Sequence, residues 1–332
     1  MINKRQLLVE RPNGMPNENT WNFVEETVAA LQDGEILIEQ SHVSLDPAMR
    51  GWINDSRSYI PPVQIGEVMR AGSVGKVIDT QGETKFKVGD YVTGWGGVQQ
   101  YYVGNGDGFV QIEPNPDNHP KYLGVLGMPG MTAYFGILEV GEIKEGDVVL
   151  LSGGAGAVGS VVGQIAKIKG CTVIGIAGGP EKCAVLVNEV GTDAAIDYKN
   201  QNIDEQIKIH APDGIDIFFD NVGGNILDLA LDNLRDRARV IICGAISQYS
   251  HHDAVEGPSL YLRLAEKYAR MEGFTVMHFE EHYERASKEL LDLYNQKKLN
   301  VPFHIEEGVD NFPLALQKLF TGGNTGKLMV KI

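Results

Sequence analysis

The 332-residue sequence contains only three cysteines, Cys171, Cys183 and Cys243. An odd number of cysteines without a Cys-x-x-Cys spacing argues against a disulfide framework and against a structural zinc site. All three fall in segments that we expect to form strands or helices, where a buried free thiol is the usual role. We therefore expect neither disulfides nor a metal centre built on cysteine.

The sequence also lacks an apolar run that could span a membrane, and residues 1–6 lack the apolar core of a signal peptide. Basic residues are scarce: 29 Lys and Arg stand against 44 Asp and Glu, which gives a formal net charge of -15. Such an acidic chain argues against non-specific binding to nucleic acid or to an anionic membrane surface. We expect a cytoplasmic protein that binds neither nucleic acid nor membrane.

Glycine, in contrast, is abundant, and three of the 40 glycines form the most informative motif. Gly154, Gly156 and Gly159 follow the G-x-G-x-x-G spacing, directly after the apolar run 148–152 and before an amphipathic helical pattern at 160–169. In a dinucleotide-binding turn these glycines permit the bend, the approach of a pyrophosphate and close helix packing, while helix amides face the phosphates. The alternative is a tight strand-to-helix turn without a ligand.

The pattern of predicted strands and helices changes twice along the sequence, and the length of the chain predicts two domains. Residues 1–125 contain short strands between glycine and proline turns, which predicts a β-rich, barrel-like domain. Residues 126–299 alternate strands and helices, which predicts an α/β fold with a doubly wound parallel sheet, its sixth strand at 274–278. Residues 300–332 resemble residues 1–125 in their pattern of short strands, so we expect this segment to pack on the first domain.

The end of the second predicted strand bears on the choice of cofactor. An NAD site usually has Asp or Glu there to bind the ribose hydroxyls. Here the strand runs into Ala177-Gly-Gly-Pro-Glu-Lys182, with no acid at its tip. The small residues leave room for a 2′-phosphate, and Lys182 follows in the first turn of the next helix, which favours NADPH. If Glu181 serves as the missing acid, NADH is favoured instead.

Four longer motifs support this interpretation. They are Gly127-Met-Pro-Gly-Met-Thr-Ala-Tyr134, Gly156-Ala-Val-Gly-Ser-Val-Val-Gly-Gln-Ile-Ala-Lys167, Asp220-Asn-Val-Gly-Gly224 and Cys243-Gly-Ala-Ile-Ser-Gln-Tyr249. Together they resemble the zinc-independent branch of the medium-chain dehydrogenase/reductase superfamily, and most of all the prostaglandin reductases (leukotriene B4 12-hydroxydehydrogenases), 2-alkenal reductases and curcumin reductases. The resemblance extends from Ser44-Leu-Asp-Pro-Ala-Met-Arg50 to Gly323-Asn-Thr-Gly-Lys327. It implies a GroES-like substrate domain at 1–125, an NADP-binding Rossmann domain at 126–299, and a homodimer.

The resemblance also assigns cofactor-binding residues. Lys182 and Tyr198 match the pair that binds the cofactor phosphate, and Asn221 follows a strand's carboxyl end, where ligands bind in such sheets. Without a ligand, Tyr198 would be a partly exposed aromatic and Asn221 a turn-forming residue. The full set for NADP(H) is Gly154, Gly156, Ala157, Val158, Gly159, Lys182, Tyr198, Asn221, Cys243, Gly244, Ala245, Ile246, Ser247, Gln248, Tyr249, Phe274, Thr275, Val276 and Asn324.

Zinc-dependent relatives hold a catalytic metal with Cys and a Gly-His-Glu motif. In this sequence Gly66 directly precedes Glu67 and no cysteine occurs before Cys171, so we expect no catalytic metal and no alcohol oxidation by Lewis-acid activation. In the resembling family, hydride passes to the β-carbon of an α,β-unsaturated ketone or aldehyde whose carbonyl is polarised by hydrogen-bond donors. Tyr249 matches the donor tyrosine. Its alternative role is to position the cofactor only.

Substrate contacts are expected at Tyr59, Met128 and Tyr249, although core packing also explains the first two. The family often has tyrosine where this sequence has Ala48, so the hypothesis is a wider pocket for bulky enones. Two other functions stay open: an NADPH quinone reductase of the same superfamily, and an NADPH-binding protein without turnover.

Overall fold

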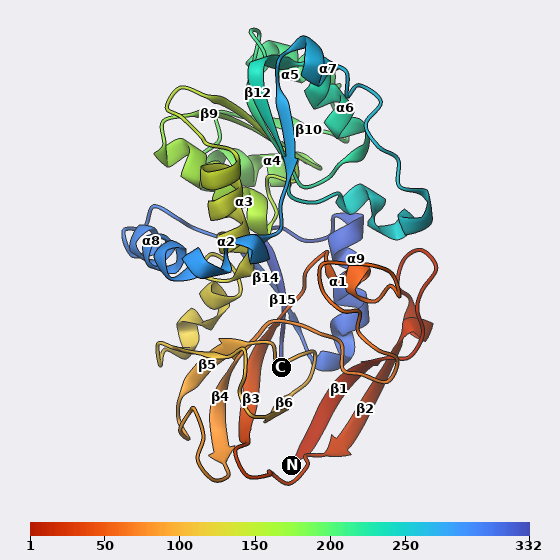
Figure 1. The fold of residues 1–332 in the computed structure, drawn as a ribbon, viewed down its shortest axis with the longest axis vertical. Helices are drawn as coiled ribbons and strands as arrows, with labels where there is room; N and C mark the ends of the chain where they lie inside the picture. Colours follow the sequence, from red (N-terminus) through yellow and green to blue (C-terminus); the bar gives the residue numbers. More distant parts are fainter. The chain divides into compact units, whose positions relative to one another are not determined.

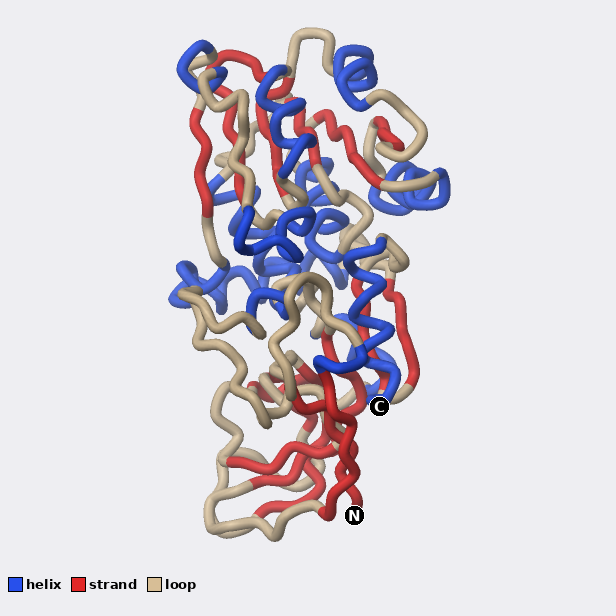
Figure 2. Tube along the Cα trace, turned by 90° about the vertical axis from the view of Figure 1, so that its right-hand side faces the viewer, coloured by secondary structure: helices blue, strands red, loops and turns tan.

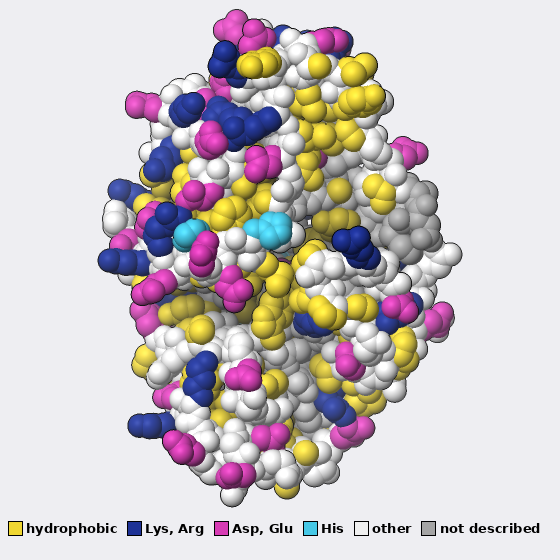
Figure 3. All heavy atoms as spheres, viewed as in Figure 1, with side chains coloured by type: hydrophobic (Ala, Val, Ile, Leu, Met, Phe, Trp, Pro, Cys, Tyr) yellow, Lys and Arg dark blue, Asp and Glu magenta, His cyan; other side chains and the backbone are white. Residues whose placement is uncertain are grey.

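The computed structural model describes residues 1–117, 119–250 and 255–332. Residues 1–123 and 303–332 form one compact unit, called unit 1, and residues 124–302 form a second, called unit 2. Within the described ranges, no helix combines the length and the apolar character needed to cross a membrane. On the face drawn in Figure 3, basic and acidic side chains are interspersed.

Unit 2 is built on a six-stranded parallel sheet with the strand order β10-β9-β8-β11-β12-β13 (Figure 1). The order reverses direction beside the first strand, which confirms the predicted doubly wound α/β fold. The strands are β8 (Val148–Leu151), β9 (Thr172–Ala177), β10 (Ala194–Asp197), β11 (Ile215–Asp220), β12 (Leu234–Ile242) and β13 (Arg270–Gly273).

Helices cover both faces of this sheet (Figure 2). They are α2 (Met128–Phe135), α3 (Ala157–Ile168), α4 (Pro180–Val185), α5 (Ile203–His210), α6 (Gly224–Asp232), α7 (Arg263–Glu266) and α8 (Tyr283–Asn295). In β8, Val149 and Leu151 join the core with α2, α3 and α8, whereas Leu150 joins the core with α5 and α6. Burying each such side chain stabilises the fold by about 1.5–3 kcal/mol, which explains why this strand is apolar on both faces.

The sixth strand lies earlier in the sequence than we predicted. β13 ends at Gly273, and Val276–His282 forms a 3-10 helix instead of a strand. The ring of Phe274 packs between Phe219 and Phe279, with centroid distances of 6.5 and 6.3 Å. Thr275 then caps the short helix. The apolar residues that suggested a strand are therefore used to anchor a turn.

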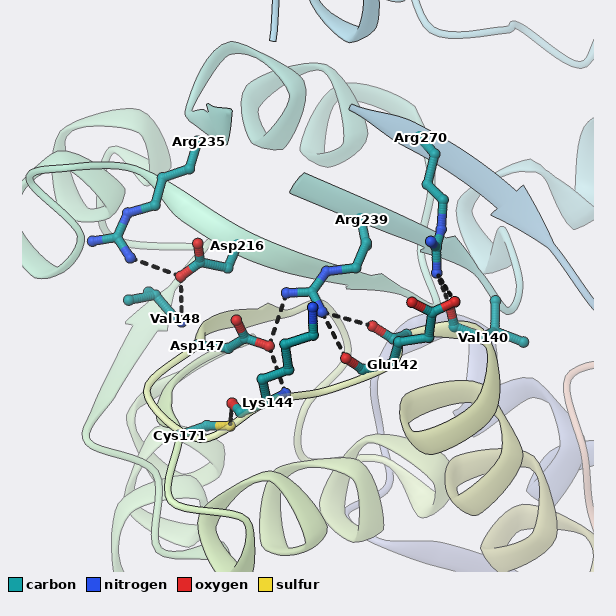
Figure 4. A network of polar contacts seen from close by, with 11 residues as sticks. Val140, Glu142, Lys144, Asp147, Val148, Cys171, Asp216, Arg235, Arg239 and Arg270 are labelled. Carbon is teal, nitrogen blue, oxygen red and sulfur yellow. Dashed lines mark hydrogen bonds and ion pairs between the residues drawn. The ribbon is translucent and has the colours of Figure 1, made fainter. Parts of the chain in front are cut away.

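Polar contacts join the amino-terminal parts of the unit 2 strands (Figure 4). Arg239 donates to Asp147 at 2.8 Å and to the carbonyl of Glu142 at 2.7 Å. Asp216 accepts from Arg235 at 2.7 Å and from the Val148 amide at 2.8 Å. These bonds connect the strands near their amino-terminal ends, on the side of the sheet opposite to the carboxyl ends.

Unit 1 is β-rich, as predicted. The hairpin β1 (Ile2–Leu8) and β2 (Trp21–Thr27) accompanies a seven-stranded sheet of β3 (Ile36–Ser44), β4 (Ser73–Thr80), β5 (Tyr91–Gly94), β6 (Tyr101–Gly104), β7 (Val110–Ile112), β14 (Phe303–Glu307) and β15 (Lys327–Lys331). Its helices include α1 (Met49–Trp52) and α9 (Phe312–Thr321). β15 pairs antiparallel with β3, which brings the C-terminal segment into the sheet of the N-terminal one (Figure 1).

Candidate cofactor site

The glycine turn connects β8 to α3 in unit 2. Gly156 is the N-cap of the helix, with extended backbone. A Cβ on Gly159 would lie 2.4 Å from the carbonyl oxygen of Gly153 and 2.8 Å from Gly154 Cα, so the helix packs directly on the turn and only glycine fits. The first N–H groups of a helix have no intrahelical acceptors and carry partial positive charge. The turn, including Ala157 and Val158, is therefore suited to bind a phosphate.

A second turn follows β9, and its glycine backbone packs against Tyr198. Gly178 lies against the ring of Tyr198, since a Cβ there would come within 2.7 Å of the phenol Cζ and Oη. Tyr198 is 45% exposed. Glu181 is an exposed residue in the first turn of α4. The turn thus presents a tyrosine hydroxyl beside a short stretch of glycine backbone.

Two lysines flank this turn. Burial lowers the pKa of Lys182, and the nearby charge of Lys199 lowers it further. Neither lysine forms an ion pair with any residue that the structure describes. Lys199 also interacts with the charge of Asp197, whose pKa it helps to lower. Two like charges held close attract a multiply charged anion, because such a ligand removes their repulsion.

Sequence reasoning missed Lys199, although its position directly after the Tyr198 match was a signal for it. Asp197, the last residue of β10, fixes this segment. Its carboxylate accepts the amides of Gly179 at 2.8 Å and Lys199 at 3.0 Å and the Asn200 side chain at 2.7 Å. Because these donors occupy both oxygens, Asp197 organises the turn rather than serving as a ribose ligand.

Asn221 follows β11, at the carboxyl end of the sheet. Its side-chain nitrogen donates to the carbonyl of Ser152 at 2.8 Å, and its Cβ lies 3.4 Å from the place where a Cβ on Gly153 would be. The carbonyl of Asn221 accepts from Ile246 N at 3.2 Å. Asn221 therefore contacts both the glycine turn and the segment 243–249. These contacts bring the assigned cofactor-binding segments close together, as binding of one ligand requires.

The segment 243–249 follows β12 and contains the predicted catalytic residue. Tyr249 Oη accepts the Ala245 amide at 3.3 Å and lies 2.8 Å from where a Cβ on Gly244 would be. Ser247 Oγ donates to the carbonyl of Val222 at 2.6 Å. The Tyr249 contacts fold the segment back on itself and place the hydroxyl over its backbone, while the Ser247 bond joins the segment to the loop after β11. Gln248 belongs to the same turn, and its amide donates to the Ala245 carbonyl at 2.8 Å.

Cys243 begins this segment. Burial raises the pKa of its thiol to about 12, with the charge of Asp220 adding to the effect. Its raised pKa keeps the thiol protonated, so the thiol is not activated as a nucleophile. The remaining unit 2 cofactor prediction, Phe274 to Val276, is the anchored turn after β13, where Phe274 N donates to the carbonyl of Ile242 at 3.4 Å.

The predicted substrate residues lie in different units. In unit 2, Met128 opens α2, is 39% exposed and has its sulfur 4.0 Å from Tyr283 Oη. In unit 1, the Tyr59 hydroxyl accepts from Trp52 Nε1 at 2.9 Å, and Ala48 is the N-cap of α1. Asn324, also in unit 1, donates to the carbonyl of Gly326 at 3.1 Å.

Glu67, the residue of the incomplete metal motif, closes a turn in unit 1. Its carboxylate accepts the Gln64 amide at 2.9 Å. Among the residues that the structure describes, no group of three or more His, Cys, Asp or Glu side chains is arranged to hold a metal ion.

Comparison with known proteins gives the family. Residues 4–112 match a model described as the N-terminal domain of oxidoreductase, and residues 157–293 match one described as zinc-binding dehydrogenase. The chain is 36% identical to NADPH-dependent curcumin reductase of Escherichia coli (strain K12), over 99% of this chain and 97% of that protein. It is 36% identical to prostaglandin reductase 1 of Bos taurus, over 96% and 95%.

A solved structure is also similar. CurA from Vibrio vulnificus in complex with NADPH is 37% identical and superposes with a TM-score of 0.93, covering 99% of this chain and 98% of that one. Identity above 30% along nearly the whole length, together with both family models, shows that the chain belongs to the medium-chain dehydrogenase/reductase superfamily.

Proposed function

We propose that this protein uses NADPH to reduce the carbon–carbon double bond of α,β-unsaturated ketones or aldehydes, without zinc. The observation that carries the proposal is the turn after β9, where Lys182, Lys199 and Tyr198 gather and neither lysine forms an ion pair with a described residue. This donor set suits the 2′-phosphate that distinguishes NADPH from NADH. The relatives named for curcumin and prostaglandin reduction support the same reaction class.

The residues present fit NADPH at two further places. The glycine turn leaves no room for a side chain at Gly159 and ends in the amides of α3, which suit a pyrophosphate. Asn221 and the segment 243–249 lie at the carboxyl ends of the central strands, the usual ligand position in such sheets. When bound, the cofactor supplies hydride to the β-carbon of the substrate.

The chain's own residues orient the reaction and stabilise charge. The hydride acceptor gains negative charge on its carbonyl oxygen, which becomes an enolate oxygen. We assign Tyr249 as the hydrogen-bond donor to that oxygen. The Ala245 N–H, which donates to Tyr249 Oη at 3.3 Å, strengthens the hydroxyl as a donor, because hydrogen bonds in a chain polarise one another. The α-carbon is then protonated, and water is the proposed source.

Products test the reaction class. Purified protein is incubated with NADPH or NADH and a panel of enones, enals and quinones, and the products are identified as cofactor oxidation is followed. Saturated ketones or aldehydes support the proposal. A hydroquinone as the only product identifies a quinone reductase, and NADPH binding without any turnover identifies a non-catalytic NADPH-binding protein.

The role of Tyr249 has its own test. Loss of one hydrogen-bond donor to a developing oxyanion costs about 10²–10³-fold in kcat in comparable sites. We expect Tyr249→Phe to lower kcat by at least about tenfold while the NADPH dissociation constant stays within about threefold of wild type. Full kcat in Tyr249→Phe would refute the donor role and leave only a positioning role.

Substrate size is proposed to depend on Ala48. It packs against the unit 1 core that includes Met49 and Trp52, and a larger side chain there would narrow the adjacent space. We expect the wild-type enzyme to prefer a diarylheptanoid enone over a short alkenal, and Ala48→Tyr to reduce that preference. Equal kcat/KM for the two substrates in wild type would contradict the proposal.

A homodimer formed through β13 is proposed for the quaternary structure. β13 is an edge strand, and all four of its residues are exposed. Antiparallel pairing of two copies about Met271 would place Arg270 of one protomer opposite Glu272 of its partner, which is a favourable cross-strand pair. Sedimentation should find a dimer that Met271→Lys converts to a monomer. Met277→Lys, at a methionine that is 45% exposed elsewhere, should leave the dimer intact.

A further inference from the structure

Three of the segments assigned to the cofactor meet at Asp220, the last residue of β11. Asp220 is only 1% exposed. Its Oδ1 accepts hydrogen bonds from Ser152 Oγ at 2.8 Å and from the amides of Val222 and Gly223, each at 2.9 Å. Its backbone carbonyl accepts the Cys243 amide at 2.9 Å. Asp220 thus joins the end of β8, the loop after β11 and the segment after β12.

The hydroxyl of Ser152 has one proton, and its neighbours decide where that proton points. Ser152 Oγ accepts the backbone N–H of Asn221 at 2.8 Å and lies 2.8 Å from Asp220 Oδ1. An oxygen that already accepts two amide hydrogens serves as an acceptor, so Ser152 donates to it. The bonds therefore have one direction, from Asn221 through Ser152 to Asp220. Ser152 is fully buried, so water does not compete for these bonds.

The same serine fixes the Asn221 side chain. The Ser152 carbonyl is an acceptor, so the amide group that meets it at 2.8 Å must be Nδ2. The amide oxygen Oδ1 is then on the other branch of the side chain. No hydrogen bond between residues that the structure describes ends on this oxygen. Asn221 therefore presents an acceptor at the carboxyl end of the central strands.

We infer that Ser152 and Asp220 are positioning residues that orient Asn221, so that its Oδ1 accepts a hydrogen bond from the cofactor. The inference rests on the proposed function for the identity of that cofactor. NADPH offers suitable donors in its carboxamide N–H and its ribose O–H groups. Ser152 and Asp220 do not touch the ligand; they act through Asn221.

Asp220 offers a substitution that separates geometry from charge. Its Oδ2 is buried and has no hydrogen-bond partner. Asp220→Asn can place its NH2 group there and keep Oδ1 for all three donors, whereas Asp220→Ala removes the acceptor. Ser152→Ala removes the hydroxyl that links the Asn221 backbone N–H to Asp220, and it leaves the carboxylate and the Ser152 carbonyl in place. Asp220→Asn should therefore retain the cofactor affinity that Asp220→Ala and Ser152→Ala lose.

The experiment measures dissociation constants for NADPH and NADH by fluorescence titration, together with the melting temperature of the protein without cofactor. We expect Ser152→Ala and Asp220→Ala to raise both dissociation constants about tenfold, or about 1.4 kcal/mol, without changing their ratio. Asp220→Asn should stay within about threefold of wild type. Ser152→Ala should also increase the deuterium isotope effect on kcat, because a misplaced cofactor slows hydride transfer.

A double variant tests whether Ser152 acts through Asn221. If it does, Ser152→Ala adds nothing in an Asn221→Ala background, because the side chain that Ser152 positions is already absent there. Additive losses would overturn the inference, as would wild-type affinity in Ser152→Ala or equal losses in Asp220→Asn and Asp220→Ala. If Asp220→Ala does not fold, Ser152→Ala and the double variant decide the question.

Binding and turnover separate this inference from the proposed function. A wild-type protein that binds NADPH and reduces no enone refutes the proposed reaction, but the dissociation constants still test the positioning role. A wild-type protein that binds neither cofactor refutes both. The 3-acetylpyridine analogue, which lacks the carboxamide N–H, identifies the donor: an unchanged penalty for Asn221→Ala with this analogue assigns a ribose hydroxyl, and a lost penalty assigns the carboxamide.

Discussion

Asp197 and Asp220 occupy equivalent places in unit 2, yet their surroundings shift their pKa values in opposite directions. Each is the last residue of a parallel strand and accepts three hydrogen bonds. The bond from Asn200, followed by the Gly179 amide, lowers the pKa of Asp197. Burial raises the pKa of Asp220, against the opposing effect of its amide donors.

The difference comes from the use of the second oxygen. Asp197 distributes its three donors over both oxygens at the edge of the sheet, and the charge of Lys199 also stabilises its carboxylate. Asp220 concentrates its donors on Oδ1 in the middle of the sheet and leaves Oδ2 buried without a partner. We therefore expect the Asp197 turn to decide which cofactor binds, through Lys182 and Lys199, and the Asp220 junction to decide how either cofactor is oriented.

The largest expected effect is on cofactor preference. A hydrogen bond to a charged group is worth about 1.5–3 kcal/mol, so the double variant Lys182→Ala/Lys199→Ala should lower kcat/KM for NADPH by at least about 100-fold. With NADH, kcat/KM should stay within about threefold of wild type. Lys169→Ala, at an exposed lysine after α3, is the matched control and should change neither value. Equal losses with both cofactors would contradict the assignment of the Asp197 turn to the 2′-phosphate.

A smaller effect is expected from Gly178→Ala. The added methyl would come within 2.7 Å of the Tyr198 ring and must displace it, which moves the hydroxyl but leaves both lysines. We expect the NADPH dissociation constant to rise by about three- to tenfold and that of NADH to stay the same. Gly257→Ala adds a methyl where no atom lies within 4 Å and serves as the control. An unchanged NADPH affinity in Gly178→Ala would exclude Tyr198 as a ligand.

The fold of unit 2 was predictable where strands are buried on both faces. The run 148–152 is apolar because Leu150 faces one core and Val149 and Leu151 face the other. β13 escaped prediction because it is an exposed edge strand whose sequence Arg-Met-Glu-Gly has no apolar pattern. The apolar residues after it were read as a strand, although Phe274 turns into the core.

The site was predictable only where its residues are close in sequence. The glycine motif and Lys182 follow their strands directly, so spacing alone places them. The bond between Ser152 and Asp220 joins residues 68 positions apart, and it exists because β8 and β11 are neighbours in the sheet. Likewise Lys199 meets Lys182 because β9 and β10 are paired. Such contacts depend on strand order, which the sequence pattern does not specify.

The smallest expected effect is on the stability of the protein, and it tests the comparison of Asp197 with Asp220 most directly. A group whose pKa is lowered by folding stabilises the protein above its ordinary pKa, near pH 4, and loses this contribution as the pH falls through the folded value. Asp197 is such a group, so Asp197→Asn should lower the melting temperature at pH 7, and the difference from wild type should shrink as the pH falls towards 4.

Asp220 should behave in the opposite way, because its pKa is raised by folding. Its favourable contribution is present below its ordinary pKa and is lost as the pH rises through the folded value, where a buried charge must form. Asp220→Asn should therefore match or exceed the wild-type melting temperature at pH 7 and fall relative to wild type as the pH is lowered. Thermal unfolding of both variants without cofactor, at pH 7 and near pH 4.5, checks the two signs. If both variants destabilise the protein equally at pH 7, the unpartnered Oδ2 is not what distinguishes the two aspartates.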